Sequence, residues 1–302
     1  GQQQQGQRER ERRRRVVYSV GGFAAVHEVA VSENYYVLLQ PPVHPEVLPY
    51  LLGEESALGC LRWREGEEAV LHVVPRPGSG AERRGEQPLR LPLRPALFAY
   101  HLVNAFEGAP DPSTGSSSSP SLPHPSSPPP EDGWTTTYSA SSAAAPPAAA
   151  AAEGGGGGGV SSSHVVITLD AVVYDRLPAA VGGWQPHQRH ARAEEAGGDA
   201  GWRPRLQRLH LHLASRTVTP LPTPAPPRHP HLELPAFNTA YTARPYRYVY
   251  GCSPDFSDAS CGLSKADLTT RQSQRWCPGP GYLCSQPTFV PRRPAAAANH
   301  TG

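Results

Sequence analysis

The chain has 302 residues and a formal net charge of +2, and 38% of its residues are hydrophobic. It could hold one large domain or two ordinary ones, but its 36 prolines and 29 glycines fall largely in low-complexity runs, so the folded portion is well short of the full length. The small net charge excludes a global field that would attract nucleic acid or an anionic membrane, and no apolar run approaches the length of a membrane-spanning helix.

The cysteines favour a reducing compartment. They are five in number, and none stands in a Cys-x-x-Cys pair. This pattern disfavours a disulfide framework or a zinc site and favours free thiols. Because the chain begins on Gly1, with no methionine and no signal-peptide pattern, we expect a fragment of a longer protein.

The sequence changes character at Val16. Residues 1–15 are a Gln tract followed by a mixed charge run, which predicts a disordered segment. An RNA-binding arm is the alternative there, and the lack of interleaved aromatic residues weighs against it. Residues 16–43 are rich in β-branched and aromatic residues and predict two short strands. Residues 60–76 predict a hairpin with its turn near 65–67, and residues 88–107 end in another strand.

The middle of the chain alternates between low complexity and strand patterns. Residues 108–163 contain serine, proline and alanine runs and six consecutive glycines, and they cannot bury enough apolar area to offset their chain entropy. We expect a long disordered insertion there, and a second irregular insertion at 179–202. Between and after them, residues 164–177 and 205–218 predict strands. His210 and His212 fall on the polar face of the latter, where exposed histidines are a more common finding than metal ligands.

Three further short segments, 246–253, 262–268 and 286–292, also predict strands. With many short strands, turn residues between them and no amphipathic helix of useful length, the sequence predicts an all-β fold: a propeller, a barrel or a sandwich. A propeller tolerates long loop insertions best, because its blades project loops from both faces.

Two histidines stand beside polar companions in stretches that otherwise resemble buried strands. His27 lies in "AVHEVAVSENYYVLL" and His101 in "AYHLVNAFE". A buried histidine is more often a hydrogen-bonded core residue than a ligand, and the polar neighbours weaken that interpretation without excluding it. Because the two residues are far apart in the sequence, any shared site must be built by the fold.

Four segments resemble the motifs of the carotenoid cleavage oxygenases. They are "VHEVAVSENYYVLL", "YHLVNAFE", "LELPAFNTAYTARPYRYVYG" and "CSQPTFVPRRP", and they occur in the order that the family has. The stretches "FAYHLVNAFE", "YRYVYGCS" and "LSKADL" look most like the carlactone synthase branch of that family.

The resemblance implies a seven-bladed β-propeller, incomplete in this chain, with an Fe(II) ion held on its axis by four histidines. His27 and His101 match the second and third of these metal ligands, and we expect the first and fourth to lie outside the chain. The family also places glutamates behind the histidines, where they accept imidazole N–H groups. Glu233 matches one of them. Gln286 stands where another is usual, and because it brings no negative charge we expect weaker iron binding, by about 10- to 100-fold, or altered activity.

The function implied by the resemblance is that of a non-haem Fe(II) dioxygenase. Such an enzyme uses dioxygen to cleave a conjugated double bond of a carotenoid or apocarotenoid into two carbonyl products. The resemblance also implies residence in a plastid and peripheral association with a membrane, and it implies no nucleic-acid partner. The alternative is a catalytically inactive propeller that acts as a binding or interaction module, which Gln286 and the large insertions favour.

The expected organisation follows from these patterns. A disordered Gln/Arg-rich segment precedes blades that carry both histidines, a low-complexity insertion separates them from the remaining blades, and a tail ends the chain. The corresponding ranges are 1–15, 16–107, 108–163, 164–294 (with the irregular insertion 179–202) and 295–302.

Overall fold

Strands dominate the part of the protein that the computed structural model describes. The described residues are 18–108, 135–137, 165–178, 204–223, 231–255, 260–279, 282 and 284–291. Their helical elements are short: α2 (Val47–Leu51), α3 (Gly80–Arg83) and the 3-10 helix η2 (Thr239–Tyr241). The prediction of an all-β fold is therefore confirmed. No helix within these residues has the length and apolar character needed to cross a membrane.

The first sheet is antiparallel, in the order β1-β2-β5-β6. Its strands are β1 (Ala30–Val31), β2 (Tyr35–Gln40), β5 (Ala69–Pro75) and β6 (Leu89–Leu93). In β2, buried and half-buried residues alternate, as expected for a strand with one face on the core. β5 is buried at six of its seven positions because it lies between β2 and β6 and is covered on both faces.

The second sheet, β11-β10-β9-β7, supplies the backbone of the candidate site. Its strands are β7 (Phe98–Gly108), β9 (Val166–Tyr174), β10 (Arg205–His212) and β11 (Thr217–Leu221). All nine residues of β9 are buried, in keeping with an apolar strand between two neighbours. The pairing of β7 with β9 is irregular between Ala99 and His101 and again between Leu102 and Asn104. Such bulges redirect side chains, and here they flank His101.

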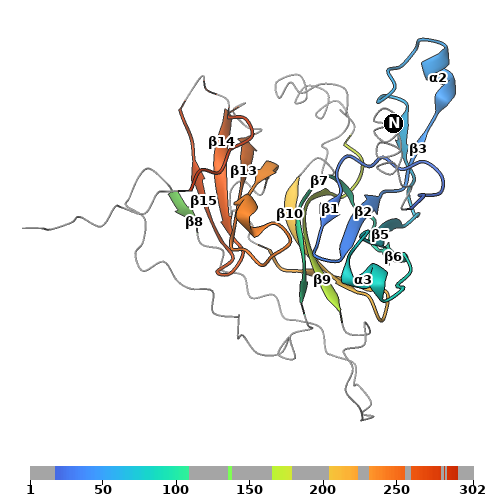
Figure 1. Ribbon diagram of the computed structural model, residues 1–302. Helices are drawn as coiled ribbons and strands as arrows, with labels where there is room; N and C mark the ends of the chain where they lie inside the picture. The colour runs from blue at the N-terminus through green and yellow to red at the C-terminus, as the bar shows by residue number, and fades with distance from the viewer. Residues whose placement is uncertain are drawn as a thin grey trace, which may run out of the picture.

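The third sheet has the order β12-β13-β14-β15-β8. Its strands are β12 (Glu233–Ala236), β13 (Tyr248–Asp255), β14 (Ser260–Asp267), β15 (Gln272–Trp276) and β8 (Thr135–Thr137), and a separate ribbon pairs β3 (Val43–Pro45) with β4 (Leu61–Trp63). The sheet that contains β7 lies between the other two large sheets (Figure 1), and β7 contacts both β1 and β12.

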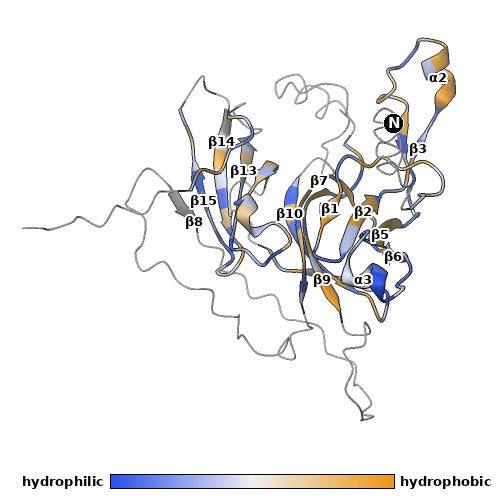
Figure 2. Ribbon diagram, viewed as in Figure 1, coloured by the Kyte–Doolittle hydropathy of each residue, from blue (hydrophilic) through white to orange (hydrophobic). Residues whose placement is uncertain are grey.

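The main core joins the first two sheets. Its buried side chains come from β2, β5 and β6 on one side and from β7, β9 and β10 on the other, and β5 and β9 are among the most hydrophobic elements in Figure 2. A smaller cluster, which includes Val172, Leu206 and Val249, joins the second sheet to the third. Burial of these apolar surfaces holds β7 against both neighbouring sheets.

Two strand predictions are wrong. The predicted hairpin over 60–76 does not form, because β4 pairs with β3 while both edges of β5 are occupied by β2 and β6. Residues 286–291 form no strand, since Pro287 and Pro291 lack the N–H that a ladder needs. Conversely β15 was not predicted, because its residues are mostly polar.

Other predictions are confirmed in part. Strand β9 lies within 164–177 and β13 overlaps 246–253, but the strand expected over 205–218 ends at His212, where the chain turns back as β11. Of the insertion 108–163, the structure describes Gly108 and β8, which pairs with β15; the rest, like 1–15, 179–202 and 295–302, lies outside the described residues. Cys60 and Cys277 are free thiols.

Candidate metal centre

The fold brings His27 and His101 together. His101 lies on β7, and His27 lies in an irregular segment just before β1, which packs on β7. The centroids of the two imidazole rings are 5.4 Å apart and the ring planes are nearly perpendicular. Contrary to the appearance of its sequence, His27 is exposed, whereas the side chain of His101 is only 13% exposed.

Glu28 stands between the two rings. Its Oε1 is 2.9 Å from Nδ1 of His101 and 3.9 Å from Nδ1 of His27. Its Oε2 accepts a hydrogen bond from the backbone N–H of Leu102 at 2.8 Å. Each of the three side chains offers one ligand atom, and these atoms lie within 4.8 Å of one another. This donor set, with two imidazoles and one carboxylate, fits a divalent transition metal.

Glu233 approaches His101 from the opposite side. Its Oε2 lies 3.4 Å from Nε2 of His101 and accepts a hydrogen bond from the N–H of Leu234 at 2.9 Å. Its Oε1 accepts a hydrogen bond from the hydroxyl of Tyr174. Leu234 has a φ of 48°, a strained value for a side-chain-bearing residue, in the bulged strand β12. The local backbone is thus turned so that Glu233 is held in place.

The two carboxylates determine the charge of the imidazole between them. Burial by itself would lower the pKa of His101, but the hydrogen bond to Glu28 and the charges of Glu233 and Glu28 outweigh it and raise that pKa above 6.5. Burial would likewise raise the pKa of Glu28, and His101 together with the Leu102 N–H holds it below its usual value. The centre therefore favours a cation.

Aromatic side chains form a wall beside the histidines. The ring of Tyr100 packs edge-on against His27 at 5.8 Å and against Phe98 at 4.6 Å, measured between centroids. Tyr174 lies 5.9 Å from Tyr100. Behind them, Val43, Leu61 and Trp63 of the β3–β4 ribbon complete the apolar cluster. Phe98 and Tyr174 are buried and Tyr100 is half-buried, so the cluster forms an apolar layer beside the two histidines.

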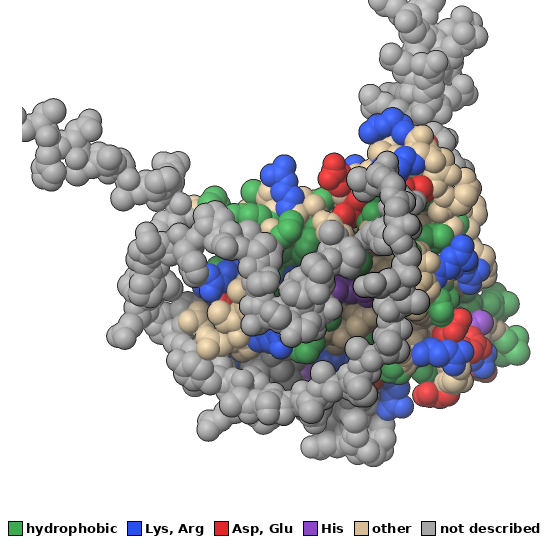
Figure 3. Space-filling model, turned by 90° about the horizontal axis from the view of Figure 1, so that it is seen from below, with side chains coloured by type: hydrophobic (Ala, Val, Ile, Leu, Met, Phe, Trp, Pro, Cys, Tyr) green, Lys and Arg blue, Asp and Glu red, His purple; other side chains and the backbone are tan. Residues whose placement is uncertain are grey.

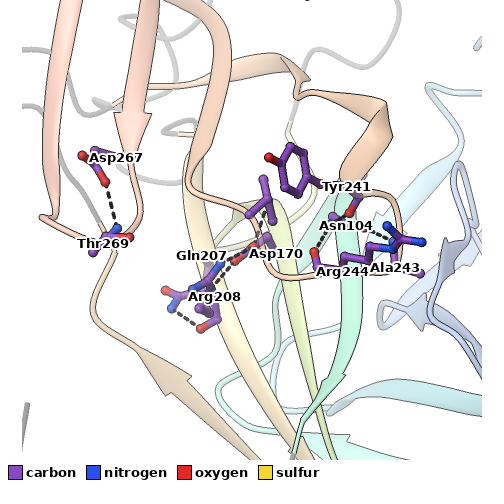
Figure 4. A network of polar contacts seen from close by, with 10 residues as sticks. Asn104, Asp170, Gln207, Arg208, Tyr241, Ala243, Arg244, Asp267 and Thr269 are labelled. Carbon is purple, nitrogen blue, oxygen red and sulfur yellow. Dashed lines mark hydrogen bonds and ion pairs between the residues drawn. The ribbon is translucent and has the colours of Figure 1, made fainter. Parts of the chain in front are cut away.

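The other polar residues of the two histidine segments hold loops and sheets together. Asn104 donates hydrogen bonds to the carbonyls of Tyr241 and Arg244 and accepts one from the N–H of Ala243, as Figure 4 shows. Glu107 accepts hydrogen bonds from the hydroxyl of Ser32, at 2.6 Å, and from both the backbone and the side chain of Asn34. Asn104 and Glu107 therefore link β7 to neighbouring segments of the chain.

A second charged network lies further along strands β7 and β9. Asp170 on β9 stands opposite Asn104 on β7 and opposite Arg208 on β10. Its oxygens accept two hydrogen bonds from Arg208, both 2.8 Å long, and one from the hydroxyl of Tyr246 (Figure 4 shows the Arg208 pair). Burial, with the nearby charge of Asp170, raises the pKa of Tyr246 well above 10.

Two candidate groups lie apart from this centre. Gln286 is exposed and donates a hydrogen bond to the carbonyl of Pro235 at 3.3 Å, and among the described residues neither histidine is its hydrogen-bond partner. His210 and His212 lie on β10 with their ring centroids 6.2 Å apart. Within the described part of the chain, they belong to no cluster of three metal-binding side chains.

Sequence reasoning counted Glu28 only among the polar companions of the histidines and did not identify it as a partner of His101. It also missed Tyr174, which lies in an apolar strand where nothing in the sequence distinguishes it from a core residue. Glu233 was found only because its segment resembles a family motif.

The geometry defines an all-β protein with a histidine and carboxylate centre suited to a metal. Comparisons with known proteins agree with this description. The family model described as retinal pigment epithelial membrane protein matches residues 2–301, so the chain belongs to that family. The predicted membership in the carotenoid oxygenases is confirmed.

Two curated relatives match shorter segments. Apocarotenoid-15,15'-oxygenase from Synechocystis is 35% identical over 86 residues, which cover 28% of this chain and 16% of the relative. Beta,beta-carotene 15,15'-dioxygenase from Mus musculus is 35% identical over 60 residues, covering 20% of this chain and 10% of the relative. The matched segments are thus a small part of both relatives.

Solved structures match over most of the chain. Cobalt-substituted Synechocystis ACO has a TM-score of 0.56 and 21% identity, covering 93% of this chain and 44% of that protein. A chimera of ACO and RPE65 gives a TM-score of 0.55 and 21% identity, covering 91% and 43%. The chain therefore shares their fold and spans less than half of their length.

Proposed function

We propose that the whole protein is an Fe(II)-dependent dioxygenase that cleaves a conjugated double bond of a carotenoid or apocarotenoid into two carbonyl products. The convergence of His27 and His101, with Glu233 behind the second ring, is the observation that carries this proposal. The names of the Synechocystis and mouse relatives support the substrate class, and the cobalt-substituted relative supports a metal at the centre.

The proposed architecture of the whole protein is a seven-bladed propeller, and the sheets described above would be some of its blades. The first sheet is a four-stranded antiparallel unit in which the strands keep their chain order, as a propeller blade does. His27 lies just before the first strand of the first sheet and His101 lies on the second sheet, so that a metal on a common axis would link the two sheets.

The residues of the chain have distinct proposed roles. Bound Fe(II) would supply the activation of dioxygen beside the double bond. His27 and His101 would hold the ion as neutral imidazoles, which suit iron of intermediate softness. Glu233 would accept the Nε2–H of His101, which leaves Nδ1 as the ligand atom and fixes the plane of the ring. Tyr100 would lie against a rigid polyene, and the buried Phe98 and Tyr174 behind it would exclude water.

The test is iron content followed by product analysis. Protein loaded with Fe(II) without oxygen and then exposed to ¹⁸O₂ and an apocarotenal should form two carbonyl products. His101→Ala should reduce both bound iron and product formation by more than about 100-fold, because a ligand and its supporting carboxylate are lost together. His212→Ala, a histidine change on β10 away from the centre, is the matched control and should change neither. Iron bound without product would support the inactive binding module instead.

We further propose that the protein docks on a lipid bilayer through the segment around α2. Val47, Leu48, Tyr50 and Leu51 are between 54% and 72% exposed. The helix projects from the body and is largely apolar in Figure 2. The β3–β4 ribbon that carries it also supplies Val43 to the aromatic wall. Such a surface next to the candidate site would let an apolar substrate pass from lipid to protein.

Vesicle binding tests this second proposal. Basic and acidic side chains are interspersed on the underside of the molecule in Figure 3, and the net charge of the chain is only +2, so neutral phosphatidylcholine vesicles are the appropriate probe. Leu48→Glu with Leu51→Glu should reduce co-sedimentation at least about 10-fold, since charged groups do not enter the apolar layer. Val290→Glu, at a residue that is 78% exposed, is the control and should bind as the parent does. Equal binding by all three proteins would exclude docking through α2.

A further inference from the structure

The segment that precedes His27 is held on the first sheet by polar side chains that take no part in the candidate centre. Residues 18–23 belong to no strand, and they contact Gln40 of β2 and His72 of β5. These two side chains lie on the face of the sheet away from the main core, because the adjacent positions of both strands belong to that core. His72 is only 1% exposed there, and a buried imidazole needs hydrogen-bond partners.

The hydrogen bonds around His72 have one consistent direction. The side-chain NH₂ group of Gln40 donates to the carbonyls of Gly21 and Phe23, at 3.0 Å each. Its Oε1, which is 2.9 Å from Nε2 of His72, must then accept, so Nε2 carries the proton of the imidazole. The lone pair of Nδ1 accepts a hydrogen bond from the hydroxyl of Tyr18 at 2.9 Å. A neutral imidazole therefore satisfies every one of these contacts.

The surroundings of His72 favour the neutral ring that these bonds require. The ring of Tyr18 packs against it, with centroids 5.5 Å apart. Burial lowers the pKa of His72, and the charge of Arg90 adds to this effect from the position directly opposite on β6. The set of bonds from Tyr18 through His72 to Gln40 is thus complete near neutral pH.

The backbone of this segment is shaped to meet Gln40. Gly22 lies between the two accepting carbonyls and has a φ of 74°, which residues with a side chain rarely adopt. A Cβ added there would meet nothing within 4 Å, so the position requires a conformation and not free space. At the other end, Ala30 pairs with β2. Residues 24–29, which include His27, are therefore fixed at both ends.

We propose that Gln40 and His72, together with Tyr18, position His27 opposite His101 by holding the preceding segment on the first sheet. The three side chains are positioning residues, because their described hydrogen bonds join the segment to the sheet and not to either histidine of the centre. The importance of this placement for a metal rests on the proposed function. The placement itself can be measured without a metal.

The backbone N–H of Leu102 reports the placement, because it donates to Oε2 of Glu28, the neighbour of His27. Its hydrogen exchange is measured in the whole, metal-free protein by mass spectrometry with residue resolution. Gln40→Glu still accepts from His72 but cannot donate to the two carbonyls, so the Leu102 amide should exchange at least about 10-fold faster. His72→Gln keeps an N–H that can reach Gln40, and it should accelerate exchange less than His72→Leu does.

A change in the segment itself gives an independent test. Gly22→Ala places a side chain on the strained φ without altering the sheet, and it should accelerate exchange at Leu102 as Gln40→Glu does. Gly53→Ala is the matched control, because Gly53 has a φ of 72° and equally open space just after α2. It should leave the exchange at Leu102 unchanged. Gly22→Ala carries the test if the changes in the sheet prevent folding.

Co²⁺ affinity, measured by calorimetry on the same proteins, tests the consequence for His27. Gln40→Glu and Gly22→Ala should bind Co²⁺ about 10-fold more weakly than the parent, at a nearly unchanged urea midpoint. Parent-like exchange at Leu102 in both variants would overturn the proposal. Faster exchange with the parent's affinity would also overturn it, because the segment would then not position the ligand. A parent that binds no Co²⁺ would overturn the proposed function instead, and the exchange rates would still decide whether these side chains hold the segment.

Discussion

Two carboxylate centres lie along the paired strands β7 and β9. They differ in the basic side chain that the carboxylates bind, which is an arginine in one and a histidine in the other. At the first, Asp170 is fully buried and binds Arg208 through two hydrogen bonds. At the second, Glu28 and Glu233 bracket His101. Both centres include a tyrosine that donates its hydroxyl proton to a carboxylate, Tyr246 in one and Tyr174 in the other.

The difference lies in whether the cation can be exchanged. The guanidinium of Arg208 cannot lose its proton under ordinary conditions, so its pair with Asp170 is permanent and joins β9 to β10. The imidazole of His101 can lose a proton, and the nitrogen that is freed could then bind the metal of the proposed function. Similar side chains thus give a structural centre in one position and a candidate functional centre in the other.

The largest expected effect is the loss of stability when the buried ion pair of Asp170 and Arg208 is broken. Asp170→Asn leaves the charge of Arg208 in a largely buried position without compensation, which should lower the free energy of unfolding by about 3–5 kcal/mol. The measurement is urea denaturation followed by tryptophan fluorescence. Metal affinity of the folded fraction should stay close to that of the parent, because Asp170 does not contact the histidines.

A surface pair of the same type is the control for that change. Asp175 and Arg205 form an ion pair with side chains that are 59% and 37% exposed. Asp175→Asn should lower the free energy of unfolding by less than about 1 kcal/mol, since water already screens the pair. If the two substitutions were equally costly, burial would not be what distinguishes the Asp170 pair.

The sequence predicted the class of fold but not how its strands pair. Alternation in β2 and the apolar run of β9 identify strands from local pattern alone. The pairing of β4 with β3 depends instead on a distant competition, because β5 is already paired on both edges. The polar strand β15 forms because β14 offers it an edge, which its own residues do not reveal.

The candidate site shows the same limit. His27, His101 and Glu233 were identified because their segments resemble known motifs. The position of Glu28 depends on the irregular backbone before β1, which lets the side chains of His27 and Glu28 lie on the same side. The alternation of a regular strand would place these two side chains on opposite faces. Gln286 lies at the surface against Pro235, and its expected role behind a histidine stays a prediction.

The smallest expected effect comes from the protonation of His101, which should make the stability of the protein depend on pH. In the metal-free chain the pKa of His101 is raised above 6.5, so below that pH both the folded and the unfolded chain hold the proton and its stabilising contribution is complete. As pH rises through the folded pKa, the contribution is lost. His101→Gln should remove this loss of stability, as measured by the urea midpoint at pH 6 and pH 8.5.

Comparison with the variant is needed because other histidines act in the opposite direction. Burial lowers the pKa of His72 and of His210, so their contributions increase stability as pH rises. The difference between the parent and His101→Gln isolates the centre. Added Co²⁺ should stabilise the parent more at pH 8.5 than at pH 6, because the metal must displace a proton from His101. An equal gain at both values would mean that the ion binds without this imidazole, which would contradict exchange at the centre.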